Sequence, residues 1–369
     1  MSTEKLYYKD SHISEFEATV TKVGDGFIVL DKTAFFPEGG GQMADTGYIN
    51  GIKVEDVHEK EGEIRHYLNG SFNVGDEVKG ILDFDERIRR MRLHSAEHIV
   101  SGLVNKLYGF NNVGFHLRDI VTLDFDGELD DEKISLVEMR ANEAVMKNVP
   151  IKTYFPKKEE IEKIPFRAKL ETDKMENLRI VEIEGIDICA CCAPHVKTTG
   201  EIGILKILSA DRHRGGMRLT MSAGLDAYNI FDGYQRSVVK ISGMLSSKRE
   251  EVSNYVKNLK DERDTLKFEK GKLEEELVTY MPTDEAVVFA DLSDAAQRKY
   301  CNILMDHHKI AAVFCGEKFI IGSKSVNLKE KAKEICTALN GRGGGRQEMI
   351  TGTAKADKEI VYNYFANLL

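Results

Sequence analysis

Two short motifs, about a hundred residues apart, constrain the fold of this chain more than any other feature. His94 and His98 are four positions apart, and Cys191 and His195 repeat that spacing. Residues four apart share one face of a helix, so each motif can offer two ligand atoms to one ion. Three imidazoles and a thiolate suit tetrahedral zinc, in a site that looks structural unless a ligand is labile or substrate binds as a fifth. Binding through both motifs requires a fold that brings them together.

Two alternatives at these motifs stay open. Cys189 and Cys192 form a C-x-x-C pair of their own, and either could replace Cys191 as the thiolate ligand. Residues 94–98 also match the H-x-x-E-H order of inverzincin peptidases, in which Glu97 would be the general base. Such a peptidase needs a distal glutamate as its third ligand, whereas the obvious further ligands here are a cysteine and a histidine.

Composition narrows the class of protein. A chain of 369 residues is long enough for two or three domains. Its formal charge of −9 argues against a protein that coats nucleic acid indiscriminately, although a local basic patch could still bind one RNA. Three of its six cysteines fall within residues 189–192, unlike the regular framework of a secreted disulfide domain. With no signal peptide and no apolar run of about 18 residues, we expect a cytoplasmic protein without a membrane segment.

The pattern along the chain predicts an α+β multidomain protein in four parts. These are a β-barrel-like domain over 1–85, an α+β domain over 86–225, a helical arm over 226–282 and an α/β domain over 283–369. Short alternating runs such as 27–30 and 80–84 indicate strands in the first part. The second part carries both metal motifs. In it we expect helices over 86–110 and 131–147 and strands over 120–125 and 178–183.

The arm and the last part have signals of their own. Leucine or valine recurs at seven-residue intervals at the following positions: Leu245, Val252, Leu259, Leu266 and Leu273. This predicts a long helix or a helical hairpin that ends at Pro282. Arg249, Arg263 and Lys270 interrupt the alternate positions, so packing on the same chain and a two-chain coiled coil both remain open. Strands over 286–290 and 310–314 are expected in the α/β domain.

Two glycine-rich segments and two basic clusters are further candidates for binding a ligand or RNA. Gly39, Gly40 and Gly41 leave bare backbone N–H groups that can approach a ligand beside Gln42, although the segment could equally be a hairpin turn. Gly341–Arg346 suits phosphate or sugar contacts, or is a mobile surface loop. The basic clusters fit an RNA end, or pair with Asp83, Asp85 and Glu86; their members are Arg87, Arg89, Arg90 and Arg92, then Lys206, Arg212, Arg214 and Arg218.

Taken in order, these strings resemble the alanyl-tRNA editing proteins, the AlaX family, which are free-standing relatives of the editing domain of alanyl-tRNA synthetase. The resemblance spans nearly the whole chain and rests on the segments 35–42, 45–47, 94–98, 191–196, 199–203 and 343–346. The last segment is similar to the glycine-rich signature of the synthetase's C-terminal domain. The resemblance therefore implies the long form of the family, in which a helical arm joins an editing domain to a C-terminal domain.

The resemblance also implies roles for single residues. His94, His98, Cys191 and His195 would bind Zn²⁺, and Gly39, Gly40, Gly41 and Gln42 would form the catalytic glycine-rich motif, with Thr33 recognising a serine hydroxyl. RNA contacts are expected at the following arginines: Arg87, Arg90, Arg92, Arg214, Arg218, Arg342 and Arg346. The family's Cys-Gly-Gly-Thr-His is here Cys191-Cys-Ala-Pro-His195, which alters the backbone around the thiolate.

The expected activity is hydrolysis of the ester that joins serine, or glycine, to alanine tRNA. The protein would then be a trans-editing aminoacyl-tRNA deacylase with tRNA as its partner, and a homodimer through the arm or the C-terminal domain is one option. Two other classes remain: a non-catalytic tRNA-binding protein with a structural zinc, and a zinc peptidase. The role of the zinc, in activating water or in positioning substrate, is left open by the sequence.

Overall fold

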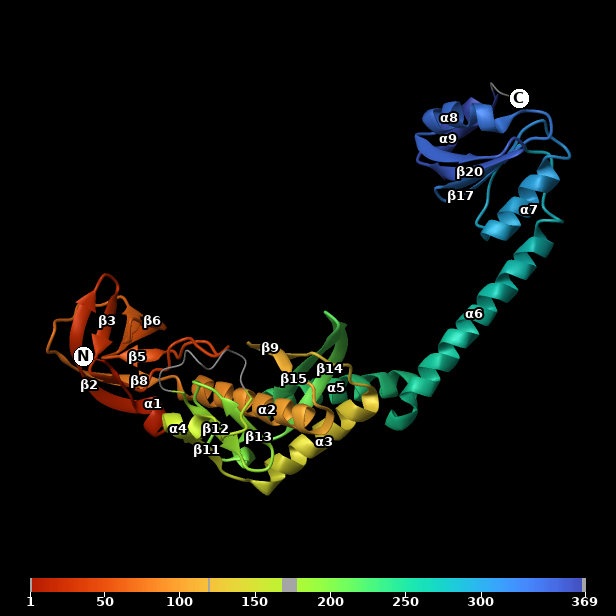
Figure 1. Ribbon diagram of the computed structural model, residues 1–369. Helices are drawn as coiled ribbons and strands as arrows, with labels where there is room; N and C mark the ends of the chain where they lie inside the picture. The colour runs from red at the N-terminus through yellow and green to blue at the C-terminus, as the bar shows by residue number, and fades with distance from the viewer. Residues whose placement is uncertain (1, 119, 168–177, 367–369) are drawn as a thin grey trace. The chain divides into compact units, whose positions relative to one another are not determined.

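The expected α+β multidomain architecture is confirmed by a computed structural model, which describes residues 2–118, 120–167 and 178–366 (Figure 1). Contacts divide the chain into two compact units, Met1–Ser237 and Val238–Leu369. The finer division at residues 85, 225 and 282 stays a prediction. Within the described residues, none of the helices combines the length and apolar character needed to cross a bilayer.

The first unit begins with six strands that close into a barrel in the order β2-β3-β7-β6-β5-β8. Buried and exposed residues alternate along β8, as expected for a strand with one face toward a core. A short parallel pair, β1 (Glu4–Lys5) with β4 (Lys32–Thr33), and the single-turn helix α1 (Leu6–Lys9) lie outside the barrel strands. The barrel strands are β2 (Glu15–Gly24), β3 (Phe27–Leu30), β5 (Gly47–Ile49), β6 (Ile52–Lys60), β7 (Glu63–Leu68) and β8 (Glu77–Leu82).

The rest of the first unit is built around the long helix α2 (Phe84–Tyr108). A four-stranded antiparallel sheet in the order β14-β15-β10-β9, a three-stranded sheet β11-β12-β13 and helix α3 (Asp131–Lys147) pack with α2 around one core. The short elements are helix α4 (Lys158–Ile161) and the 3-10 turn η2 (Thr199–Ile202). The strands are β9 (Asn112–Leu117), β10 (Val121–Phe125), β11 (Ile151–Tyr154), β12 (Ile180–Ile183), β13 (Asp187–Ala190), β14 (Leu205–His213) and β15 (Gly216–Ala223).

Local sequence signals set both ends of α2. The Asp83 carboxylate accepts a hydrogen bond from the Glu86 backbone N–H, and acidic residues fill the first turn, where the helix dipole favours them. Gly109 adopts a left-handed conformation that closes the last turn. The apolar residues do not form a single stripe; most of the helix is buried, because strands and helices cover several of its faces.

The expected arm is two helices rather than one. Helix α5 (Gly224–Leu245) ends where Ser246 takes a positive φ and the Ser247 N–H bonds to the Ser242 carbonyl, a Schellman-type end. After a 3-10 turn, η3 (Arg249–Glu251), helix α6 (Val252–Leu277) follows. The heptad leucines Leu259, Leu266 and Leu273 of α6 are exposed. Packing on the same chain and a two-chain coiled coil both stay predictions for this stripe.

The second unit ends in a five-stranded sheet in the order β16-β17-β18-β20-β19. Only β16 and β17 pair in parallel. The glycine-rich segment is the edge strand β19 and not a loop. The elements are α7 (Asp294–Leu304), α8 (Leu328–Ala338), α9 (Lys358–Ala366), β16 (Val287–Phe289), β17 (Ala311–Cys315), β18 (Lys318–Gly322), β19 (Gly341–Gly345) and β20 (Met349–Ala354).

Candidate metal centre

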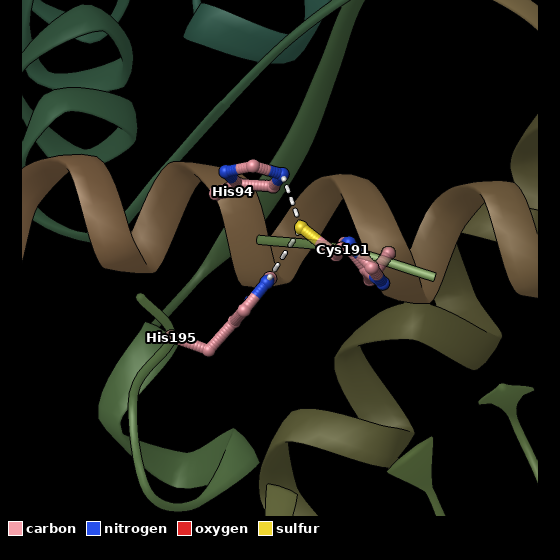
Figure 2. Close-up of side chains that lie close together, drawn as sticks. His94, Cys191 and His195 are labelled. Atoms are coloured by element: carbon pink, nitrogen blue, oxygen red, sulfur yellow. Dashed lines mark hydrogen bonds between the residues drawn. The ribbon is translucent and has the colours of Figure 1, made fainter. Parts of the chain in front are cut away.

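The two metal motifs meet inside the first unit. His94 and His98 lie on α2, and Cys191 and His195 lie on the turn that follows β13. The ligand atoms of all four residues are within 4.8 Å of one another. Figure 2 shows the Cys191 sulfur between the imidazoles of His94 and His195. The three histidines are each 2 % exposed, and Cys191 is partly exposed, so the cluster is shielded from solvent except at the cysteine.

The distances fit a tetrahedral ion. The Cys191 Sγ lies 3.6 Å from Nε2 of His94 and 3.5 Å from Nε2 of His195. Zinc bonds of about 2.0–2.3 Å in tetrahedral geometry separate ligand atoms by roughly 3.3–3.8 Å. The spacing of these donors therefore matches what one zinc ion requires, and the set of nitrogen and sulfur atoms suits that ion.

Each histidine is oriented through its other ring nitrogen. Nδ1 of His94 donates to Oε1 of Gln42 at 3.0 Å, and Nδ1 of His98 donates to Oδ2 of Asp187 at 3.0 Å. Nδ1 of His195 bonds to Oγ of Ser95 at 2.9 Å. These contacts leave the Nε2 atoms for a metal, because a ring nitrogen that donates a hydrogen bond cannot also be a ligand.

Asp187 is itself fixed on both sides. Arg167 donates to its two carboxylate oxygens at 2.7 and 2.8 Å. Gly102 of α2 permits the close approach of β13, since a Cβ at this position would lie 2.6 Å from the Asp187 Cβ. The interaction of the carboxylate with His98 and Arg167 holds its pKa below the ordinary value, against the opposing effect of burial. Asp187 is therefore an anionic hydrogen-bond acceptor for His98.

Geometry and charge favour Cys191 over its neighbours as the thiolate. Burial opposes ionisation, yet nearby His94 and hydrogen bonds from the imidazoles bring the pKa of the Cys191 thiol well below its ordinary value. Burial raises the pKa of Cys189, and it raises that of Cys192 to about 11. Cys189 lies instead with His98 and Asp187 in a second, overlapping group. The thiolate is the form that binds a metal, so the position of its sulfur and its lowered pKa favour Cys191 as the ligand.

The glycine motif is a tight turn beside the cluster. Gly39 and Gln42 exchange both backbone hydrogen bonds at 3.0 Å, and Gly40 and Gly41 have φ of 59° and 81°, as in a type I′ turn. The Gly39 N–H is thereby used, which leaves the amides of Gly40 and Gly41 for a ligand. A Cβ on Gly41 would lie 2.6 Å from the ring of Phe115, which also packs against His94.

Gln42 links this turn to the cluster. Its side chain is 1 % exposed and accepts the hydrogen bond from His94 through Oε1. Its Nε2 has no hydrogen-bond partner in the described part of the chain. An unpaired buried donor costs about 1–3 kcal/mol, so it is an expected position for a substrate acceptor.

Two residues with expected roles are buried. Thr33 is fully buried, and its hydroxyl bonds to Nε2 of His66 at 2.8 Å and accepts from the Phe35 N–H at 3.1 Å. Its expected role in recognising a serine hydroxyl stays a prediction. Arg87 is 1 % exposed and its guanidinium pairs with buried Asp45. It holds the segment after the glycine turn to α2 and cannot reach an RNA backbone.

The other predicted RNA contacts differ in accessibility. Arg90 is 8 % exposed and bonds to Glu86, Arg92 bonds to the Glu201 carbonyl, and Arg218 pairs with Asp124 at 2.6 Å. Three are exposed, namely Arg214, Arg342 and Arg346. Electrostatic contact with RNA stays a prediction for all of these and fits the exposed arginines best.

Sequence reasoning missed several residues that shape the centre. Ser95 is one of them, although it lies inside the first motif, next to His94, and could have been identified from that position. Asp187 and Arg167 carried no local signal, because their role depends on the approach of β13 to α2. The peptidase interpretation loses support here: Oε1 of Glu97 accepts hydrogen bonds from Ser101 and Asn112, both at 2.7 Å.

Comparison with known proteins places the chain in a family. Residues 3–86 match the family model of class II (A) tRNA synthetases, and residues 178–219 match that of the threonyl and alanyl tRNA synthetase second additional domain. The alanyl-tRNA editing protein AlaX-L of Pyrococcus horikoshii is 29 % identical over 98 % of this chain and 96 % of its own length. An alanine–tRNA ligase of Thermofilum pendens is 32 % identical over 97 % of this chain, which spans only 43 % of the ligase.

A second editing protein gives a higher identity over a shorter region. The alanyl-tRNA editing protein AlaX-M of Saccharolobus solfataricus is 41 % identical over 58 % of this chain and 96 % of its own length. Both editing proteins are matched over nearly their full length, in contrast to the ligase. The chain therefore belongs to the AlaX family of alanyl-tRNA editing proteins.

Proposed function

We propose that this protein is a trans-editing aminoacyl-tRNA deacylase that hydrolyses the ester between serine and alanine tRNA, with glycine as a second amino acid accepted. The observation that carries the proposal is the buried cluster of three histidines and Cys191 with the unpaired Gln42 amide at its edge. Membership of the AlaX family supports the same reaction, hydrolysis of an ester bond.

Zinc is the proposed ion, because the spacing and type of the four donors fit it. When bound, it would supply a Lewis acid to the reacting groups. The chain's own contribution is to keep the site rigid. Gln42, Asp187 and Ser95 fix the ring orientations, and burial excludes bulk water from the cluster.

Gln42 and the glycine turn are proposed to stabilise the reacting ester. In the hydrolysis, water adds to the ester carbonyl carbon, the carbonyl oxygen gains negative charge, and the bond to the ribose oxygen then breaks as that oxygen takes a proton. A donor aimed at the developing charge contributes about 2.7–4 kcal/mol. Nε2 of Gln42 is such a donor, and the unused amides of Gly40 and Gly41 lie on the same turn.

Rejection of alanine cannot depend on size, since alanine is smaller than serine. A hydrogen bond to the serine hydroxyl is the available basis, because alanine then leaves a polar partner unpaired. The hydroxyl of Thr33 already bonds to His66 and to the Phe35 N–H, which speaks against it as that partner. We therefore place the discriminating contact at the cluster and not in the barrel.

Binding of the tRNA body is proposed for the second unit. Arg342 is on the exposed edge strand β19 and Arg346 directly follows it, so both can meet phosphate oxygens. Counterion release upon such contacts predicts that affinity for tRNA falls as salt rises.

Paired cysteine substitutions test the proposal. Cys191→Ala removes the thiolate of the cluster, whereas Cys192→Ala removes the adjacent exposed thiol and is the matched control. We expect Cys191→Ala to lose zinc and seryl-tRNA hydrolysis while still binding tRNA, and Cys192→Ala to keep all three properties. Wild-type protein that binds tRNA and releases no serine would instead establish the non-catalytic alternative.

A further inference from the structure

A cavity of about 620 Å³ lies beside the glycine turn in the first unit. Three segments form its wall: residues 38–43, the first turns of α2, and the end of β9 with the residue after it. Its size falls within the range of about 300–1,000 Å³ typical of small-molecule sites. The reaction at the metal cluster does not by itself explain a hollow on this side of the turn.

The cavity and the metal centre share a wall. Gln42 lines the cavity and bonds to His94. Phe115 of β9 packs against His94 with ring centroids 4.9 Å apart, and the next residue, His116, lines the cavity. A molecule in the cavity is therefore one side chain away from the cluster.

The charges of the wall are mixed: the carboxylates of Glu38 and Glu86 stand beside three arginines, and an anion is favoured at one point only. Arg90 bonds to Glu86, and Arg89 bonds to Glu86 and Asp226, so these guanidinium groups are already neutralised. Arg118 is exposed, and within the described residues no hydrogen bond or ion pair engages it. His116 is an exposed neighbour on the same segment. Arg118 is thus the cation of this wall that is free to bind a phosphate. Its guanidinium can donate two parallel hydrogen bonds to the phosphate oxygens.

We propose that this cavity holds the 3′-terminal nucleotide of the aminoacylated tRNA, and that Arg118 binds its 5′ phosphate. The assignment rests on the proposed deacylase function. Holding the phosphate at Arg118 would position the ribose near Gln42, so that the ester on the ribose reaches the cluster. Arg118 is a positioning residue, since it contacts the nucleotide at a distance from the reacting bond.

Two minimal substrates test the contact: 3′-O-seryl adenosine and the same ester of adenosine 5′-monophosphate. In the wild type we expect the phosphate to lower KM about tenfold, as one charge-assisted contact would, with little change in kcat. Arg118→Ala should abolish this difference, and the ester without phosphate should be hydrolysed as well as by the wild type. Arg140→Ala removes an exposed arginine of α3 that does not line the cavity, and it should behave as the wild type.

Failure of the contact and failure of the function give different results. If the wild type hydrolyses seryl-tRNA but the phosphate has equal effects in Arg118→Ala and Arg140→Ala, the cavity assignment is overturned and the deacylase proposal stands. Calorimetry with adenosine and adenosine 5′-monophosphate tests the contact without catalysis. Tighter binding of the monophosphate that depends on Arg118 supports the contact even in a protein that hydrolyses no ester, and equal binding of both overturns it.

Discussion

Replacing Gln42 with glutamate separates the two contacts of this side chain. Glutamate has nearly the same shape and keeps an oxygen to accept the hydrogen bond from Nδ1 of His94, which is 3.0 Å long in the wild type. It lacks the amide N–H groups that stand unpaired in the native protein. The variant therefore preserves the orientation of the metal ligand and removes the donor proposed to act on the ester.

The expected magnitude follows from the loss of one transition-state donor. Removing such a donor from a buried site costs about 2.7–4 kcal/mol, or a factor of roughly 10² to 10³ in kcat. Repulsion between the new carboxylate and the developing oxyanion acts in the same direction. Gln42→Ala would also lose the bond to His94, so it should in addition weaken zinc binding by about 10–100-fold.

Single-turnover hydrolysis of seryl-tRNA, with zinc content measured on the same samples, tests this. We expect Gln42→Glu to retain zinc and lose activity, and the exposed charge control Gln235→Glu on α5 to retain both. A Gln42→Glu variant within about threefold of wild-type activity would refute the role of the amide. Loss of zinc from this variant would show that the glutamine acts only through His94.

Four further changes have defined outcomes. Asp187→Asn should weaken zinc binding about 10–100-fold through the loss of the His98 contact, measured by chelator competition; unchanged affinity would contradict the orienting role. Thr33→Val should lower the free energy of unfolding by about 1–3 kcal/mol and slow seryl- and glycyl-tRNA hydrolysis equally, and a serine-specific loss would restore its recognition role. Burial lowers the pKa of His66 to about 4, so between pH 6.5 and 4 the unfolded chain binds more protons at this residue than the folded chain does. The contribution of His66 to the free energy of unfolding should therefore be full above pH 6.5 and fall as the pH is lowered to 4. Urea titrations across this range measure it, and a flat profile would contradict the burial of a neutral His66. Leu266→Glu on the exposed α6 stripe should shift sedimentation of a dimer toward monomer, and a wild type already monomeric at high concentration would exclude this dimer.

Local sequence patterns predicted much of the fold. The helix over 131–147 is confirmed with the same bounds, because Asp130 caps its start and Asn148 closes its end in a left-handed conformation. The strand over 27–30 is confirmed as well. A helical hairpin was one of the two options for the arm, but the position of the break after Leu245 was not predicted. The heptad of apolar residues continues through it, and the turn at Ser246 has no glycine at the left-handed position.

Residues of the candidate site could be predicted where a short motif contains them. They could not be predicted where their role depends on contacts between distant segments. The four donors of the metal cluster could be paired from their i, i+4 spacing. The burial of Arg87 could not, because its partner Asp45 lies in a distant segment and only the packing of that segment on α2 joins them. The proposed role of Arg118 could not be predicted either, because it depends on a cavity that only the folded chain forms. Charge in a sequence does not reveal which arginines are already paired.

The central claim is that the buried histidine–cysteine cluster is the centre of an ester-hydrolysing site, and release of serine from seryl-tRNA by the purified protein tests it most directly. The protein is stripped of metal, assayed, and assayed again after zinc is restored, with alanyl-tRNA as the substrate to be spared. We predict that zinc restores serine release, that chelation abolishes it, and that alanyl-tRNA stays largely intact. Equal serine release with and without zinc, or equal hydrolysis of both substrates, would contradict the account.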